Sequence, residues 1–282
     1  MTLTQRDPGT TRAARPPVRA SIPAIVASRV RVELLTFLRV RDQVIFTFLF
    51  PTILFLIFAT VFGDDQAGSV PFAQYFLPGM IASGLLLVSF QNLAITIAME
   101  RSDGTLKRLA GTPMPPAAYF AGKIALVLVI GVAQLMLLLT VAKLGYDVPL
   151  PSGAQRWATF AWVSALSVAS GTLAGIAFSS VPKTGKSASA VVTPVVLVLQ
   201  FISGVFFAIG DVPPWMRRVS EIFPLKWTAQ GLRSVFLPAS YAAEEPAGSW
   251  QHAPMAIVLV GWCILGLVLS LRTFRWSGQE QR

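Results

Sequence analysis

Six uncharged stretches of this chain are each long enough to cross a lipid bilayer. A spanning helix needs about 20 apolar residues. Backbone polar groups must all be paired inside lipid, so a spanning stretch forms either a helix or a barrel strand. The length of these stretches and their lack of alternation exclude a barrel. The predicted fold is therefore all-α integral membrane, with six transmembrane helices at about 43–63, 75–99, 118–142, 157–181, 187–209 and 253–272.

The composition agrees with a membrane protein and excludes several site types. Of the 282 residues, 54% are hydrophobic and 13% are charged, about half the charged fraction of a soluble domain. Cys263 and His252 are the only residues of their kinds, so we expect no disulfide, cysteine zinc cluster, histidine-based metal site or histidine-dependent triad within one chain. We predict no catalytic, cofactor-binding or metal-binding residue in this chain.

The basic residues predict the orientation in the membrane. The formal net charge is +10, but the Lys and Arg residues lie beside apolar spans, which favours membrane topology over nucleic-acid binding. Six spans place both ends on one side, and 17 of the 23 Lys and Arg residues fall on that side. The positive-inside rule therefore predicts that both termini are cytoplasmic. Since no cleavable signal peptide is visible, we expect a multi-pass protein of a bacterial-type cytoplasmic membrane.

The segments outside the spans divide the chain further. Residues 1–20 are rich in Pro, Thr and Arg and predict a disordered basic tail. Residues 21–42 mix apolar and charged side chains, which predicts an N-terminal interfacial helix; a cytosolic lead-in helix is the alternative. A single transmembrane domain then covers 43–275, and 276–282 form a C-terminal tail.

The loop between the fifth and sixth spans contains two short amphipathic pieces punctuated by proline. Each piece has about a dozen residues and is too short to span. They predict either an extracellular re-entrant segment, shielded by neighbouring helices, or cap helices lying on the membrane. The residues that mark this region are Pro213, Trp215, Pro224, Leu225, Leu232 and Arg233.

The middles of the spans contain no Asp, Glu or Arg. Ion-coupled carriers usually keep an ionisable group there, so this absence disfavours a secondary carrier. Four amides remain, and they indicate either hydrogen bonds between helices or a weakly polar lining for a translocation path. They are Gln91, Asn92, Gln134 and Gln200. Gly171 and Gly175 have the small-xxx-small spacing that allows close helix packing.

A short charged segment follows the second span. It reads Glu100-Arg101-Ser102-Asp103-Gly104-Thr105-Leu106-Lys107-Arg108-Leu109, with Thr112-Pro113 after it. The pattern predicts a short helix between Gly104 and Gly111 that prolines stop before the third span. A charged turn that only anchors topology is the alternative. The run 183–187 ends like a phosphate loop but lacks its first glycine and lies between spans, so we predict no ATP site there.

This segment resembles the signature of the ABC-2 type transporter permeases, and within them the daunorubicin-resistance type. The end of the fifth span and the loop motifs around Pro213, Pro224 and Arg233 resemble that family's re-entrant extracellular region, so the likeness covers roughly residues 26–274. The resemblance implies a cytoplasmic coupling helix that docks on a separate ATP-binding subunit. The implied coupling residues are Glu100, Arg101, Gly104, Thr105, Leu106, Lys107, Arg108 and Pro113.

The resemblance also implies partners and an activity. Two ATP-binding subunits would hold ATP and Mg, and a second permease would complete a homodimer or heterodimer in the bilayer. The complex would export a lipophilic or amphipathic compound, a drug or lipid-like molecule, as in multidrug and antibiotic resistance. The alternatives are a secondary carrier, a flippase-like lipid transporter, a membrane enzyme acting on lipid, and a non-transporting assembly subunit.

Overall fold

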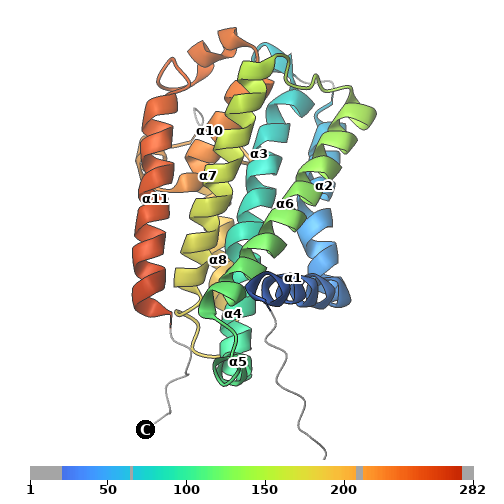
Figure 1. Cartoon of the computed structure of the whole chain (residues 1–282). Coiled ribbons are helices and arrows are strands. Elements are labelled where there is room, and N and C mark those ends of the chain that lie inside the picture. The colour runs from blue at the N-terminus through green and yellow to red at the C-terminus, as the bar shows by residue number, and fades with distance from the viewer. Residues whose placement is uncertain (1–20, 64–65, 208–211, 275–282) are drawn as a thin grey trace, which may run out of the picture.

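The computed structural model describes residues 21–63, 66–207 and 212–274, and nearly all regular structure within them is helical. The long helices run side by side and form one bundle (Figure 1). The prediction of an all-α membrane fold is confirmed, apart from one two-stranded hairpin of β1 (Gln66–Ala67) and β2 (Val70–Pro71). The predicted tails at 1–20 and 276–282 lie outside the described residues.

Five helices in the described ranges are long and apolar enough to cross a bilayer. They match the first four predicted spans and the sixth within a few residues. They are α2 (Arg41–Val61), the continuous unit Phe72–Ser102, α6 (Pro116–Tyr146), α7 (Ala154–Phe178) and α11 (His252–Thr273).

The fifth predicted span, 187–209, forms a shorter helix than expected. Helix α8 covers Ala188–Ile202, which is 15 residues, or about 22 Å against a hydrocarbon core of about 30 Å. The helix ends there because Gly204 adopts a φ of +69°, the left-handed conformation in which glycine commonly terminates a helix. Residues 208–209 lie outside the described part, so a membrane crossing by the fifth predicted span stays a prediction.

The second spanning unit contains a π-helical turn. It consists of α3 (Phe72–Leu86), η1 (Leu87–Gln91) and α4 (Asn92–Ser102), and all five residues of η1 are buried. Helix α7 packs against this turn through two glycines. A Cβ atom at Gly175 would lie 2.9 Å from the carbonyl oxygen of Phe90, which is too close for any other residue. The close packing predicted from Gly171 and Gly175 is confirmed.

Two helices lie at one end of the bundle. Helix α1 (Ile22–Arg39) crosses that end, and α5 (Thr105–Ala110) projects beyond it (Figure 1). Helix α1 packs on α6 through Phe37, which is buried beside Val127 and Ile130. The opposite face of α1 carries exposed apolar side chains, among them Val32 and Leu38.

The region between α8 and α11 lies toward the other end of the bundle. It contains α9 (Pro214–Ser220), α10 (Pro224–Phe236) and the 3₁₀ helix η2 (Ala239–Glu244). Helix α10 packs between α3, α7 and α11, and 11 of its 13 residues are buried. A cap helix on the membrane surface would keep one face exposed, so this packing favours the re-entrant alternative.

Candidate functional site

A tight turn separates α4 from α5. The Asp103 carboxylate accepts a 2.9 Å hydrogen bond from the backbone N–H of Thr105, and Gly104 adopts a φ of +77°. Side chains other than glycine rarely adopt this conformation. The predicted helix between Gly104 and Gly111 is confirmed. Glycine is required at position 104 because the turn before α5 has a positive φ there.

Helix α5 has one anchored face and one exposed basic face. Leu106 is 1% exposed and fixes the helix to the bundle, whereas Lys107 and Arg108 are exposed. Arg108 also donates a 3.0 Å hydrogen bond to the Thr105 hydroxyl. Pro113 follows in an exposed segment before α6. The projecting helix therefore offers a positively charged surface at the end of the bundle.

A buried ion cluster lies at the base of α5. The Lys123 ammonium, whose side chain is fully buried, donates to Glu100 Oε1 at 2.6 Å and to Glu33 Oε2 at 2.9 Å. The Tyr119 hydroxyl donates to Glu100 Oε2 at 2.6 Å, and Arg29 pairs with Glu33. We call these five residues the inner ion cluster.

The inner ion cluster joins three helices that are distant in sequence. Arg29 and Glu33 come from α1, Glu100 comes from α4, and Lys123 comes from α6. Two cations face two carboxylates, so the buried charges are balanced, as burial requires. Gly122 allows the close approach of α1, because a Cβ there would lie 2.7 Å from Arg29 Cγ. The inner ion cluster therefore ties α4, the helix that precedes α5, to both α1 and α6.

The loop between α7 and α8 contacts the same end of α4. The Arg101 guanidinium donates a 2.7 Å hydrogen bond to the carbonyl oxygen of Pro182. Gly185 allows the loop to approach, since a Cβ there would lie 3.1 Å from Met99 Cα. Within the loop, the Thr184 and Ser187 hydroxyls hydrogen-bond to each other. The run 183–187 thus forms a packed connection.

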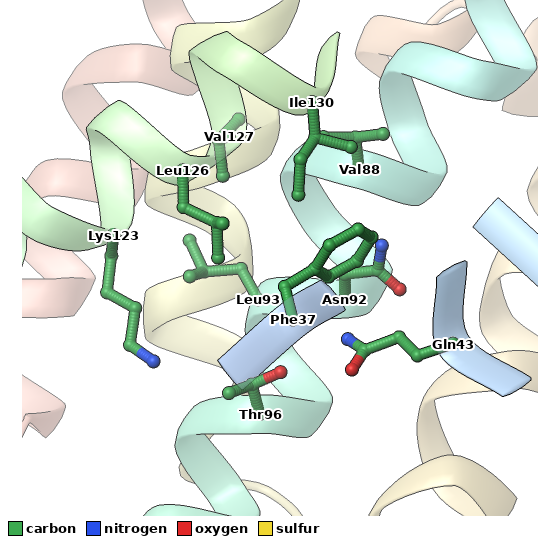
Figure 2. Close-up of a pocket in the computed structure, with 10 residues that line it drawn as sticks. All are labelled: Phe37, Gln43, Val88, Asn92, Leu93, Thr96, Lys123, Leu126, Val127 and Ile130. Carbon is green, nitrogen blue, oxygen red and sulfur yellow. The ribbon is translucent and has the colours of Figure 1, made fainter. Parts of the chain in front are cut away.

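A small pocket lies between α1, α2, α4 and α6, next to the inner ion cluster (Figure 2). Its volume is about 20 Å³, enough for about one water molecule. Asn92 and Lys123 line it together with Phe37 of α1. The Asn92 side-chain nitrogen binds within the protein, because it donates a 2.9 Å hydrogen bond to the Thr47 hydroxyl of α2.

The other three candidate path residues are buried within the chain. Gln91 lies in the π turn, Gln134 is on α6 and Gln200 is on α8. The side-chain nitrogen and oxygen of Gln134 and Gln200 have no hydrogen-bond partner among the residues that the structure describes. The structure does not bring the four amides into one described pocket.

Six residues were predicted to mark the loop between the fifth and sixth spans, and most of them lie at the beginning or on the buried face of its helices. Pro213 caps α9, and Pro224 opens α10. Trp215 is 64% exposed on α9, whereas Leu225 and Leu232 are buried on α10. The buried Leu225 and Leu232 therefore anchor α10 within the bundle.

Arg233 forms a second buried ion pair, with Glu245. Its Nε atom lies 2.6 Å from Glu245 Oε1 and its Nη2 atom lies 3.3 Å from Oε2. Arg233 Nη1 also donates to the carbonyl oxygen of Gly204 at 3.3 Å. The pair ties α10 to the segment after η2 and to the end of α8.

Sequence reasoning missed several members of both clusters. No sequence motif identified Lys123, Arg29, Glu33, Tyr119 or Glu245 as a member of a buried cluster. One signal was available. Lys123 interrupts an otherwise uncharged run within a spanning helix, and a charge there requires a partner. The identity of that partner depends on tertiary contacts.

Comparison with known proteins agrees with this architecture. The family model of the ABC-2 type transporter matches residues 27–237, which is more than half of the chain. The inner membrane transport permease YadH of Escherichia coli strain K12 is 26% identical over 193 residues, covering 66% of this chain and 72% of the relative. The YadH permease of Shigella flexneri matches to the same extent.

The matched region contains the features on which the resemblance was based. It includes α5, the inner ion cluster and all of α10. The chain therefore belongs to the ABC-2 type transporter family: it is the multi-pass inner-membrane subunit of a transporter, works with a partner ATP-binding subunit, and is not itself the ATPase.

Proposed function

We propose that this permease exports a lipophilic or amphipathic compound, drug-like or lipid-like. Two ATP-binding subunits power it, and a second permease completes the transporter. The observation that carries the proposal is the connection of α5: its exposed face bears Lys107 and Arg108, while its base is tied through Glu100 to α1 and α6.

The mechanism follows from this connection. ATP-driven closure of the partner subunits pushes α5, and the inner ion cluster transmits the displacement to Lys123 on α6 and Glu33 on α1. Nucleotide can shift the permease only if it binds one arrangement better than the other. Glu100 and Arg101 act as the hinge contacts, because Arg101 holds the neighbouring loop through Pro182.

The proposed cargo matches the interior of the bundle. Polar groups are sparse along the long helices, and Gln134 and Gln200 keep unused hydrogen-bonding capacity in the described residues. Buried amides normally have hydrogen-bond partners. The unpartnered amides of Gln134 and Gln200 could therefore make a few polar contacts with a mostly apolar cargo. Gln91 and Asn92 extend this proposed path toward the inner ion cluster.

The proposed orientation places α5 and both termini in the cytoplasm. Helix α1 then lies at the inner leaflet, where its exposed apolar residues, such as Val32 and Leu38, enter the interface. Its exposed Arg31 and Arg39 meet lipid headgroups there. In this arrangement α8 and the residues after it form the sixth crossing, and α10 is re-entrant from outside.

The docking of α5 can be tested by charge reversal. Lys107→Glu combined with Arg108→Glu changes the exposed face and leaves the inner ion cluster intact. We expect about tenfold less co-purified ATP-binding subunit, because like charges replace complementary ones at the interface. Lys143→Glu combined with Arg218→Glu is the matched control, since both residues are exposed outside the inner end. Equal retention of the subunit by both variants would refute the docking site.

The direction and energy source need a second measurement. Inside-out vesicles containing the permease and its ATP-binding subunit should accumulate a fluorescent lipophilic dye when ATP is added. The accumulation should persist after a protonophore dissipates the proton gradient while ATP is maintained. Loss of accumulation under those conditions would support a secondary carrier instead.

A further inference from the structure

A polar cavity lies between α9, α10 and the segment that precedes α11. Its volume is about 150 Å³, several times that of the pocket beside the inner ion cluster. The charged and amide side chains in its wall are those of Arg217, Glu221, Lys226, Gln230, Glu245 and Gln251. The mechanism proposed above uses none of them as a ligand site.

Lys226 is the unusual residue in this cavity. Its side chain is 3% exposed, yet its ammonium makes no hydrogen bond or ion pair in residues 21–63, 66–207 and 212–274. Its nearest recorded interaction is with the ring of Trp227, whose centroid lies 3.5 Å away. A lysine ammonium carries three donors, and burial without a partner is costly.

A second polar group in the wall is also unpaired. The Oε1 atom of Gln230 is buried and has no hydrogen-bond partner among the described residues. The Nε2 atom of the same amide makes only a long 3.4 Å bond to the carbonyl oxygen of Ser249. An amide nitrogen carries two donors, so Gln230 keeps one donor beyond that bond in the wall that it shares with Lys226.

The charge balance of the cavity favours an anion. Glu245 is committed to Arg233 through two contacts and does not pair with Lys226. Arg217 and Lys226 then stand against the single carboxylate of Glu221. The wall has an excess of positive charge, and Lys and Arg are the usual ligands of phosphate groups.

The neighbouring surface indicates where such a group comes from. Trp215, Val219 and Ile222 are exposed on the side of α9 that lies away from Arg217 and Glu221. An apolar surface on one side of α9 and a cationic cavity on its other side suit the acyl chains and the headgroup of one lipid.

We propose that this cavity is a phosphate-binding site for a lipid headgroup, in which Lys226 and Arg217 hold the phosphate oxygens and the Nε2 atom of Gln230 donates a hydrogen bond. The same chemistry would accept a free phosphate ester. The inference does not rest on the proposed export function, because the site binds its ligand without nucleotide and without regard to the cargo.

Native mass spectrometry of the purified full-length permease tests the proposal. The probes are phosphatidylglycerol, phosphatidylcholine, a neutral diacylglycerol and glycerol phosphate. We expect Lys226→Met to lower the affinity for both phospholipids about tenfold, the loss of one charged hydrogen bond. Binding of diacylglycerol should not change. Lys226→Arg should preserve phospholipid binding, and Lys143→Met is the control for loss of an exposed lysine.

The binding results distinguish a lipid headgroup from a free phosphate ester as the ligand. Binding of phospholipids but not glycerol phosphate supports a lipid headgroup, and equal binding of glycerol phosphate supports the free ester. Phospholipid affinity that is the same in wild type, Lys226→Met and Gln230→Leu would overturn the site. The Gln230 variant keeps the test decisive if Lys226→Met fails to fold, and a thermal melt identifies such a failure.

Discussion

The two buried ion clusters of this permease differ in what they connect. At the inner end, Lys123 reaches Glu33 and Glu100, which are 90 and 23 residues away in sequence. Toward the other end, Arg233 reaches Glu245, only 12 residues away. The inner ion cluster thus joins separate helices, whereas the Arg233–Glu245 pair closes one local segment.

This difference indicates different roles for similar chemistry. Contacts between distant helices can transmit a displacement, because each helix can move as a body. The Arg233–Glu245 pair fixes the shape of the loop that holds α10, and beyond that loop Arg233 contacts only the end of α8 in the described residues, through the carbonyl oxygen of Gly204. Charge alone does not distinguish the roles, since each cluster balances its buried cations with carboxylates.

The strongest test of the comparison removes the shared cation of the inner ion cluster. Lys123→Met leaves Glu33 and Glu100 buried without their common partner. We expect about 5 kcal/mol of lost stability and loss of substrate-stimulated ATPase activity in the assembled transporter. Thermal unfolding and ATP turnover measure the two effects. Lys143→Met, at an exposed pair with Asp147, should change neither, and a similar loss there would contradict the argument.

The Arg233–Glu245 pair should affect stability more than coupling. Glu245→Gln leaves a buried guanidinium without its carboxylate, and we expect a loss of about 3 kcal/mol. The ATPase activity per folded molecule should stay near that of the wild type. Replacing both residues, as Arg233→Met with Glu245→Leu, should recover most of the stability. A fall in coupling as large as that of Lys123→Met would remove the distinction between the two ends.

The packed middle of the bundle connects the two regions. Gly175→Ala would place a Cβ atom 2.9 Å from the carbonyl oxygen of Phe90 in η1, and overpacking of this kind costs about 1–3 kcal/mol. Gly261→Ala on α11 is the control, because no heavy atom lies within 4 Å of its added Cβ. Equal thermal stability of the two variants would show that the contact of α7 with η1 is not tight.

Local patterns were enough to predict most of the helical architecture. The uncharged windows located five long helices, and the glycine and prolines around 104–113 located α5. Helix α8 was predicted too long because its apolar composition continues past Ile202, whereas a left-handed Gly204 ends the helix. Hydropathy records composition and does not report that change of backbone conformation.

The pairing of the charges could not be predicted in the same way. Glu33 and Lys123 lie on helices whose approach depends on Gly122, and this contact has no signature in either segment alone. Lys226 and Glu245 lie in a segment whose sequence predicts a loop between spans. Their burial follows only from the position of α10 inside the bundle. Local sequence patterns therefore indicated where α5 lies, and tertiary packing determined how it is attached to the bundle.

The π turn at Leu87–Gln91 sets the direction in which that attachment faces. A π turn holds one residue more than the α-helical path it replaces, which rotates everything after it by about 100°. Glu100 follows η1 on the same unbroken unit. Deleting a single residue from η1 would keep the transmembrane segment apolar and helical. It would nevertheless rotate Glu100 away from Lys123 and so detach α5 from α1 and α6.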